Sequence, residues 1–129
     1  MQHNQASIDA AMTVLDDFMA AFSASDVKGI RQSFNFPHAR LHDGKVTLFI
    51  NPDDYQLGFF QATADAREWA KSVWNERRII NAGADKVHVD TEFSRLRADG
   101  SVINTYRSIY MVTRVDGHWG IQGRSSFAP

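Results

Sequence analysis

Three Asp-Gly pairs divide this chain, and each lies between segments in which apolar and polar residues alternate. The pairs are Asp43-Gly44, Asp99-Gly100 and Asp116-Gly117. Asp-Gly between such segments is a strong signal for a β-hairpin, because both turn residues need a positive φ that Gly and Asp adopt readily. The last two pairs therefore predict three long consecutive antiparallel strands, and a fourth strand precedes them. The expected ranges are 74–83, 86–97, 102–115 and 118–127.

Helical periodicity dominates the N-terminal part of the chain. Apolar residues recur every three or four positions up to about Ser23, which predicts an amphipathic helix; they are Ile8, Ala11, Leu15, Phe18 and Phe22. A second, shorter helix begins at Ser25 or Asp26 and ends before Pro37, because proline disfavours helical geometry in the residue that precedes it. The remaining elements are two short strands over 36–43 and 46–50, a packed loop over 55–60 and a helix over 63–73.

This order predicts one α+β domain over residues 1–129, in which N-terminal helices pack on a strongly curved antiparallel sheet.

The balance of charges argues against a nucleic acid as the partner. Lys and Arg number 14 against 15 Asp and Glu, whereas a non-specific nucleic-acid binder carries a clear basic surplus. The chain has no cysteine, which excludes disulfides, thiol catalysis and thiolate metal sites.

The sequence also bears on location. The first five residues are polar and lack the basic and apolar pattern of a signal peptide. No apolar stretch approaches the roughly 20 residues that span a bilayer. We therefore expect a cytoplasmic protein with neither a membrane nor a nucleic acid as its partner.

Several segments resemble the nuclear transport factor 2-like superfamily, which includes the SnoaL-like proteins. Phe18 to Ile30 (FMAAFSASDVKGI) resembles the first helix and the helix corner of that superfamily, and Asp116 to Ile121 (DGHWGI) resembles its terminal hairpin. Phe36 to Leu41 (FPHARL) and Arg124 to Phe127 (RSSF) look most like a bacterial subgroup with no assigned reaction. The resemblance implies a cystatin-like cone with an apolar interior and one open end, which is a natural small-molecule pocket. It also implies a homodimer through the outer face of the sheet.

Strand 36–43 carries the leading candidates for chemistry. Its alternation places Phe36, His38, Arg40 and His42 on one face, and imidazole titrates near neutral pH, which suits a general acid or base. If this face lines the cone, His38 or His42 would transfer the proton. In the alternative, Ala39 and Leu41 face inward and the basic face meets water.

His38 and His42 have the spacing of a helical zinc site, but a strand separates them too far to share one ion. Four residues span about 13 Å at roughly 3.3 Å each, whereas zinc ligands lie about 2 Å from the metal. We therefore expect no metal site and no cofactor.

Further polar side chains are candidates for holding a ligand. Tyr106 and Tyr110 share a face of their strand, and Trp74 could close the mouth of the cone. On the last strand Ser125 points into the cone if the alternation is regular, whereas Arg124 and Ser126 do so if the strand bulges near Gly123. The expected ligand-binding residues are Arg40, Trp74, Tyr106, Tyr110 and Ser125.

The resemblance to ketosteroid isomerases allows one sharper comparison. Those enzymes use an Asp base and an oxyanion hole that contains a Tyr. Laid over this chain, the Tyr falls at Phe18 and the Asp base within one residue of His42. Because Phe has no hydroxyl to donate, the comparison argues against the same isomerisation machinery.

Together these features predict a pocket protein for a small, largely apolar molecule. One form of it is an acid–base enzyme of the isomerase, dehydratase or hydrolase type. The alternative is a non-catalytic homodimerisation or adaptor module whose cone is filled by its own side chains, since the chain has nine Phe.

Overall fold

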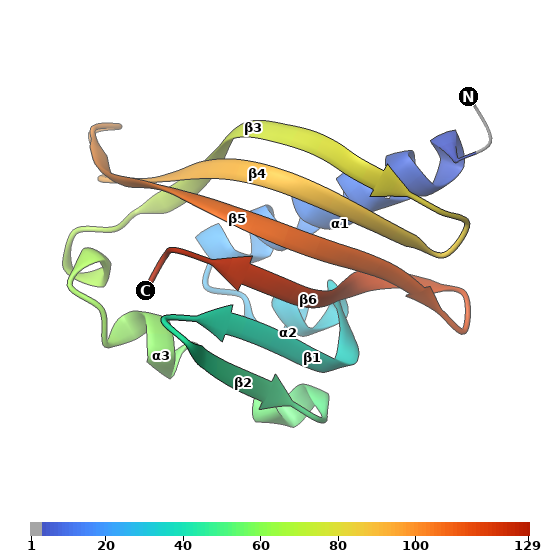
Figure 1. Cartoon of the computed structure of the whole chain (residues 1–129). Coiled ribbons are helices and arrows are strands. Elements are labelled where there is room, and N and C mark those ends of the chain that lie inside the picture. The colour runs from blue at the N-terminus through green and yellow to red at the C-terminus, as the bar shows by residue number, and fades with distance from the viewer. Residues whose placement is uncertain (1–3) are drawn as a thin grey trace.

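The computed structural model describes residues 4–129, apart from the side chain of Phe59. One long helix and one short helix precede a six-stranded sheet that is interrupted by short helical turns (Figure 1). The helices are α1 (Gln5–Ser23), α2 (Val27–Gln32) and α3 (Gly58–Gln61), and the two single 3₁₀ turns are η1 (Pro52–Asp54) and η2 (Asp65–Arg67). The strands are β1 (Phe34–His42), β2 (Lys45–Phe49), β3 (Lys71–Ala82), β4 (Lys86–Leu96), β5 (Val102–Val115) and β6 (His118–Ser126).

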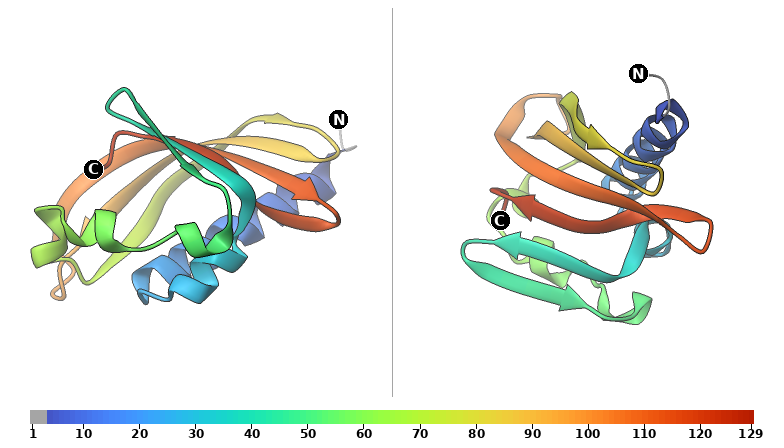
Figure 2. Two further views of the ribbon diagram at one scale, coloured as in Figure 1. Left: turned by 90° about the horizontal axis from the view of Figure 1, so that it is seen from below. Right: turned by 45° about the vertical axis from the view of Figure 1, so that its right-hand side comes forward.

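The strands form one sheet in the order β2-β1-β6-β5-β4-β3. All neighbours are antiparallel except β1 and β6, which run parallel. The sheet is strongly bent, and α1 and α2 lie on its concave side together with the segment that carries α3 and η2 (Figure 2). The predicted fold class, helices packed on a strongly curved sheet, is therefore confirmed.

The hairpin turns form as the Asp-Gly pairs predict at two of the three sites. Asp43 and Gly44 have φ of 51° and 71°, and Asp116 and Gly117 have φ of 50° and 79°. These values match the primed turn that joins two-residue hairpins. At the third pair only Gly100 has a positive φ, because the connection between β4 and β5 is longer than a two-residue hairpin.

The core lies between α1 and the concave face of the sheet. The apolar stripe of α1 is buried there; its buried apolar members are Ala11, Val14, Leu15, Phe18, Ala21 and Phe22. The turn from α2 into β1 crosses close to β6, where a Cβ atom on Gly120 would lie 2.6 Å from the carbonyl carbon of Phe34. A glycine at this point lets the start of β1 run close beside β6.

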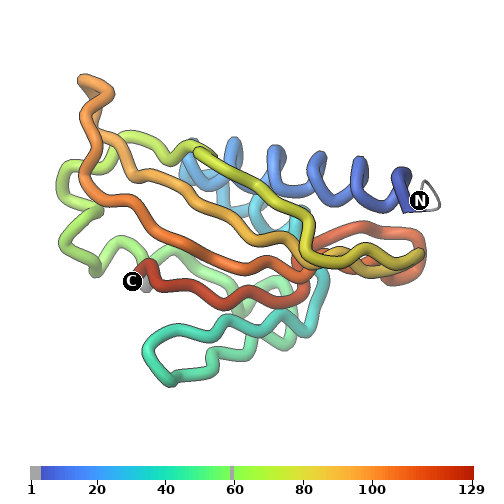
Figure 3. Tube along the Cα trace, turned by 45° about the horizontal axis from the view of Figure 1, so that its top comes forward, coloured from blue at the N-terminus to red at the C-terminus, as the bar shows by residue number. Residues whose placement is uncertain are grey.

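The helix predicted over 63–73 is wrong. Residues 65–67 form the single turn η2, and β3 begins at Lys71, where it pairs with Leu96 of β4. The helical spacing in this segment reflects packing onto other elements, since the Trp69 ring contacts the rings of Phe22 and Phe60. A short helix, α3, forms instead within the segment expected to be a loop. Figure 3 shows this segment passing close to the C-terminal end of the chain.

Candidate functional site

Three polar side chains form a row across the concave face of the sheet. Arg40 of β1 lies opposite Arg124 of β6, and Arg124 lies opposite Tyr110 of β5. Arg124 and Tyr110 are buried and Arg40 is half-buried. The basic face of β1 therefore points into the cone, as one of the two alternatives for that strand expected.

This row borders a cavity between α1 and the sheet. Its volume is about 40 Å³, enough for a few water molecules at roughly 10–15 Å³ each. The wall combines apolar side chains with three arginines and small polar groups; the lining residues are Phe18, Met19, Phe22, Arg40, Ser72, Phe93, Arg95, Tyr110, Arg124, Ser126 and Ala128. Among these described residues there is no Asp or Glu, so the charge that borders the cavity is positive.

Arg95 of the cavity wall forms a buried ion pair with Asp65. Its Nη1 donates to Asp65 Oδ2 at 3.0 Å, and both side chains are buried. Asp65 also accepts hydrogen bonds from the Tyr106 hydroxyl at 2.7 Å and from Asn104 Nδ2 at 2.8 Å. Burial opposes ionisation of Asp65, but the hydrogen bonds from Tyr106, Arg95 and Asn104 outweigh it and lower the pKa of this carboxyl. Tyr106 thus acts on the cavity by holding Asp65 against Arg95, and it does not itself line the wall.

Arg40 and Arg124 face each other across β1 and β6. Burial, and next the positive charge of Arg124, lower the pKa of Arg40 to about 10. Arg40 Nη2 donates to the main-chain oxygen of Ala128 at 2.9 Å. The positive charge of Arg124 opposes the rise that burial causes in the pKa of Tyr55, and the Arg124 guanidinium lies over the rings of Phe18 and Phe34. Two cations are thus held close together at the inner end of the cone.

A second hollow lies outside the cavity and shares Arg40 with it. Its volume is about 230 Å³, and it is lined by Arg40, Thr47, Phe49, Asp54, Gln56 and Gly58. Arg40 therefore stands between the inner cavity and this outer hollow.

His38 and His42, the predicted proton-transfer residues, lie outside the cavity wall. The His38 side chain is fully buried and stacks on the ring of Phe34 at 3.9 Å between centroids. Its Nδ1 lies 2.8 Å from the carbonyl oxygen of Ile121, which fixes the proton on Nδ1 because a carbonyl only accepts. Burial, followed by the charge of Arg124, lowers the pKa of His38 to about 3. His42 is near the end of β1, where its Nε2 lies 3.7 Å from Asp43 Oδ2.

The other predicted ligand-binding residues divide between the two faces of the sheet. Trp74 lies against the rings of Tyr110 and Phe93 and donates from Nε1 to the Leu15 carbonyl at 3.2 Å. It therefore packs against two residues of the cavity wall without lining the cavity itself. Ser125 lies on the outer face, opposite Leu41 and Ile109. Of the five residues expected to bind the ligand, Arg40 and Tyr110 line the cavity.

A bulge explains the position of Ser125. Met111 pairs with Gly123 but Val112 pairs with Ile121, so Gln122 is an extra residue in β6. One extra residue reverses the alternation, and Arg124 and Ser126 consequently point into the cone. The glycine at position 123 was the signal for this outcome. Nothing in the sequence pointed to Asp65, because its segment resembled a helix.

No group of three or more His, Asp or Glu side chains is placed to hold a metal ion anywhere in residues 4–129. Within that same range, no helix has both the length and the apolar character needed to cross a membrane.

The architecture, with a helix on a curved sheet and a cavity between them, is that of the nuclear transport factor 2-like proteins. An NTF2-like protein of unknown function from Shewanella oneidensis superposes with a TM-score of 0.72 at 16% identity, covering 94% of this chain and 98% of its own. A ketosteroid isomerase-like protein from Erwinia carotovora atroseptica gives 0.68 at 11% identity, with 92% and 93% covered. A protein from Catenulispora acidiphila in complex with S-DNPA gives 0.72 at 15% identity, with 95% and 93% covered.

The chain belongs to the family described as NTF2-like protein (DUF6841), whose model matches residues 9–126. The resemblance seen in the sequence is thereby confirmed. No curated protein matches the chain.

Proposed function

We propose that this NTF2-like protein binds a small molecule in the cavity between α1 and the concave face of the sheet. The observation that carries the proposal is the lining of that cavity, in which aromatic walls surround a few converging polar side chains. Apolar walls with few, fixed polar groups are typical of small-molecule sites. The Catenulispora acidiphila protein with S-DNPA is in keeping with a ligand-binding role for this fold.

The cavity suits binding better than proton transfer. Its titratable side chains are three arginines and Tyr110, whose ordinary pKa values are roughly 10 or higher. Burial raises the pKa of Tyr110 further. A general acid or base works best with a pKa near the operating pH, and His38 has a pKa of about 3 and no access to the cavity. Phe18 lines the wall at the position where the ketosteroid isomerase machinery would need a hydroxyl.

A thermal-shift screen of small molecules tests the proposal, since a ligand that binds the native state raises the melting temperature by mass action. Met19 lines the cavity from α1, so Met19→Trp should fill it and abolish the shift. Thr13→Trp is the matched control, because Thr13 is exposed on the same helix. Hits whose shift survives Met19→Trp would place binding elsewhere. The absence of hits at high ligand concentration would favour the adaptor module with a filled cone.

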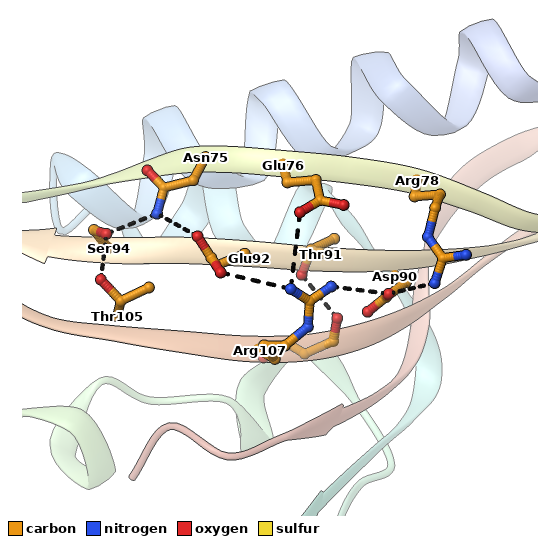
Figure 4. Close-up of polar contacts among 10 residues, drawn as sticks. Asn75, Glu76, Arg78, Asp90, Thr91, Glu92, Ser94, Thr105 and Arg107 are labelled. Carbon is orange, nitrogen blue, oxygen red and sulfur yellow. Dashed lines mark hydrogen bonds and ion pairs between the residues drawn. The ribbon is translucent and has the colours of Figure 1, made fainter.

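We also propose that the chain forms a homodimer through the outer face of its sheet. Leu41, Val46, Leu48 and Ile109 are exposed there, and exposed apolar side chains gathered on one face of a small domain are typical of an interaction surface. Beside this patch, the outer face of β3, β4 and β5 carries a network of both charge signs (Figure 4). Arg107 contacts Asp90 at 2.9 Å, Glu92 at 3.5 Å and Glu76 at 3.8 Å, and Arg78 contacts Asp90 at 2.8 Å. A surface with an apolar centre and mixed charges is suited to pairing with a copy of itself.

A further inference from the structure

We infer that the ligand of this cavity is a small apolar carbonyl compound, whose oxygen accepts hydrogen bonds from the hydroxyls of Tyr110 and Ser126. The inference rests on the proposed function and names the class of molecule that would occupy the cavity. It follows from the hydrogen bonds that the hydroxyl groups of the wall make with the rest of the protein, and from the donors that these bonds leave unused.

The hydroxyl of Tyr110 has no hydrogen-bond partner in the part of the chain that the structure describes. The side chain is only 4% exposed and lines the cavity. Its ring packs against those of Phe18 and Trp74, at 5.9 and 5.5 Å between centroids. A buried tyrosine hydroxyl ordinarily has a hydrogen-bond partner. We therefore expect the partner of Tyr110 to be a molecule in the cavity.

The surroundings of Tyr110 make its hydroxyl a donor. Burial raises the pKa of Tyr110, and the charges of Arg124, Arg40 and Arg95 oppose that rise only in part, so the phenol keeps its hydrogen. A guanidinium group has N–H donors and no acceptor. None of these three arginines can therefore accept the hydrogen of the Tyr110 hydroxyl, which remains available to a ligand.

The second donor is Ser126, whose oxygen already accepts two hydrogen bonds. Ser108 Oγ donates to Ser126 Oγ at 2.7 Å, and the main-chain nitrogen of Ala128 donates to the same atom at 3.0 Å. A serine hydroxyl has two lone pairs and one hydrogen, so both lone pairs of Ser126 are in use. Because Ser126 lines the cavity, its hydroxyl can meet a ligand there only as a donor.

Tyr110 and Ser126 are near neighbours on one face of the sheet. Ser126 pairs with Ser108 in the register of β5 and β6, and Tyr110 follows Ser108 by two residues, on the same face of β5. Side chains in this diagonal relation start roughly 7–8 Å apart. The cavity that both residues line has a volume of only about 40 Å³, so one small ligand would contact both hydroxyls. A carbonyl oxygen has two lone pairs with which to accept from them.

The rest of the wall favours a carbonyl group over a hydroxyl group. An alcohol brings a hydrogen that needs an acceptor, but no Asp, Glu, Asn, Gln or His is found among the described lining residues. Ser72 Oγ already accepts from Trp69 Nε1 at 2.9 Å. A carbonyl compound brings acceptors only, so all its polar atoms can be paired here. The rings of Phe18, Phe22 and Phe93 would surround its apolar part.

NMR titration with matched ketones and alcohols tests the inference on the unmodified protein, because shifts of the amide signals report even weak binding. The ketones are butanone, cyclopentanone, cyclohexanone and acetophenone, and each is paired with the alcohol that has the same carbon skeleton. We expect at least one ketone to bind about 10- to 100-fold more tightly than its alcohol, since the alcohol would leave a buried hydrogen unpaired.

Tyr110→Phe connects the binding to the phenol. The variant loses only a hydroxyl without a partner in the described part of the chain, so it should melt at the temperature of the wild type. Its affinity for the ketone should fall about 3- to 10-fold, as expected for the loss of one neutral hydrogen bond.

Ser126→Ala should lower the affinity for the ketone by a similar factor. It should also lower the melting temperature, because the Ala128 nitrogen and the Ser108 hydroxyl lose their acceptor. Ser125→Ala is the matched control, since Ser125 precedes it on β6 and lies on the outer face of the sheet. This control should leave the affinity for the ketone unchanged.

Each contrary result has a distinct meaning. Alcohols that bind as tightly as their ketones, or a ketone affinity that Tyr110→Phe leaves unchanged, overturn the inference while the proposed pocket stands. A marked fall in the melting temperature of Tyr110→Phe overturns it as well, because the hydroxyl would then serve the fold. If no ketone binds, the inference fails; if the broader thermal-shift screen also yields no ligand, the proposed function fails with it.

Discussion

Arg40 on β1 lies directly opposite Arg124 on β6, so that two guanidinium groups share the concave face of one sheet. The position of each is set by local features of the backbone. Gly120 allows β1 to approach β6, and the extra residue Gln122 turns Arg124 inward. The two cations are close enough for the positive charge of Arg124 to lower the pKa of Arg40.

The first prediction concerns the half-buried charge of Arg40. Arg40→Met should leave the free energy of unfolding unchanged or raise it by up to about 1 kcal/mol, because an apolar side chain of similar length replaces a partly buried charge. The lost hydrogen bond to the Ala128 oxygen offsets part of the gain. Urea denaturation of the wild type and the variant measures the difference. A loss of more than about 2 kcal/mol would show that Arg40 is mainly structural.

Arg95→Met should lower the free energy of unfolding, unlike Arg40→Met, although both arginines line the same cavity. Arg95→Met leaves the buried Asp65 carboxylate without its cation, and removing one partner of a buried pair costs about 3–5 kcal/mol. We therefore expect a marked fall in the free energy of unfolding, measured under the same conditions as for Arg40→Met. The double variant Arg95→Met/Asp65→Asn should recover part of the loss, because it removes the stranded charge. Equal stability of Arg40→Met and Arg95→Met would contradict this distinction.

Because folding lowers the pKa of His38, the stability of the protein should depend on pH. The pKa of His38 is about 3 in the folded protein, against about 6.5 in an unfolded chain. Above pH 6.5 the side chain is neutral in both states and its contribution is fully present. As the pH falls below 6.5 the unfolded chain takes up a proton that the folded protein does not, so stability declines by about 1.4 kcal/mol per pH unit until the pH nears 3.

The measurement is urea denaturation at pH 7, 6 and 5 for the wild type and for His38→Gln. The variant lacks this titration and should lose less stability between pH 7 and pH 5, whereas the other histidines contribute equally to both proteins. Parallel pH profiles for the two proteins would mean that folding leaves the pKa of His38 near its value in the unfolded chain. In that case a role for His38 in proton transfer would regain support.

Turn chemistry and periodicity predicted most of this fold. The Asp-Gly pairs gave two of the hairpins, and the strands end within a few residues of their expected positions because turn residues determine the backbone locally. The helix expected over 63–73 failed for a different reason. Its apolar residues are spaced by contacts with distant elements, such as Trp69 with Phe22, and this tertiary packing overrides local spacing.

The candidate site was harder to predict because it depends on register. Alternation groups Arg40 with His38 on one face of β1, but the sequence left open whether that face or the opposite one lines the cone. Ser125 and Arg124 exchange faces when one residue is inserted, and a sequence does not specify where the ladder absorbs the extra residue. Asp65 joins Arg95 across 30 positions in the chain, a pairing that only the folded sheet brings about.

The last prediction concerns the outer face and the proposed homodimer. Val46 and Leu48 on the edge strand β2 are 69% and 55% exposed, and they share a face with Leu41 of β1. Burying such side chains against a second copy would contribute about 25 cal/mol for each Å² of apolar surface. We expect the wild type to be dimeric by light scattering and the double variant Val46→Lys/Leu48→Lys to be monomeric, because four lysines would meet across the two-fold axis. Thr47→Lys is the matched control, since Thr47 lies between them on the opposite face of β2 and should leave the dimer intact. A monomeric wild type would overturn the dimer proposal.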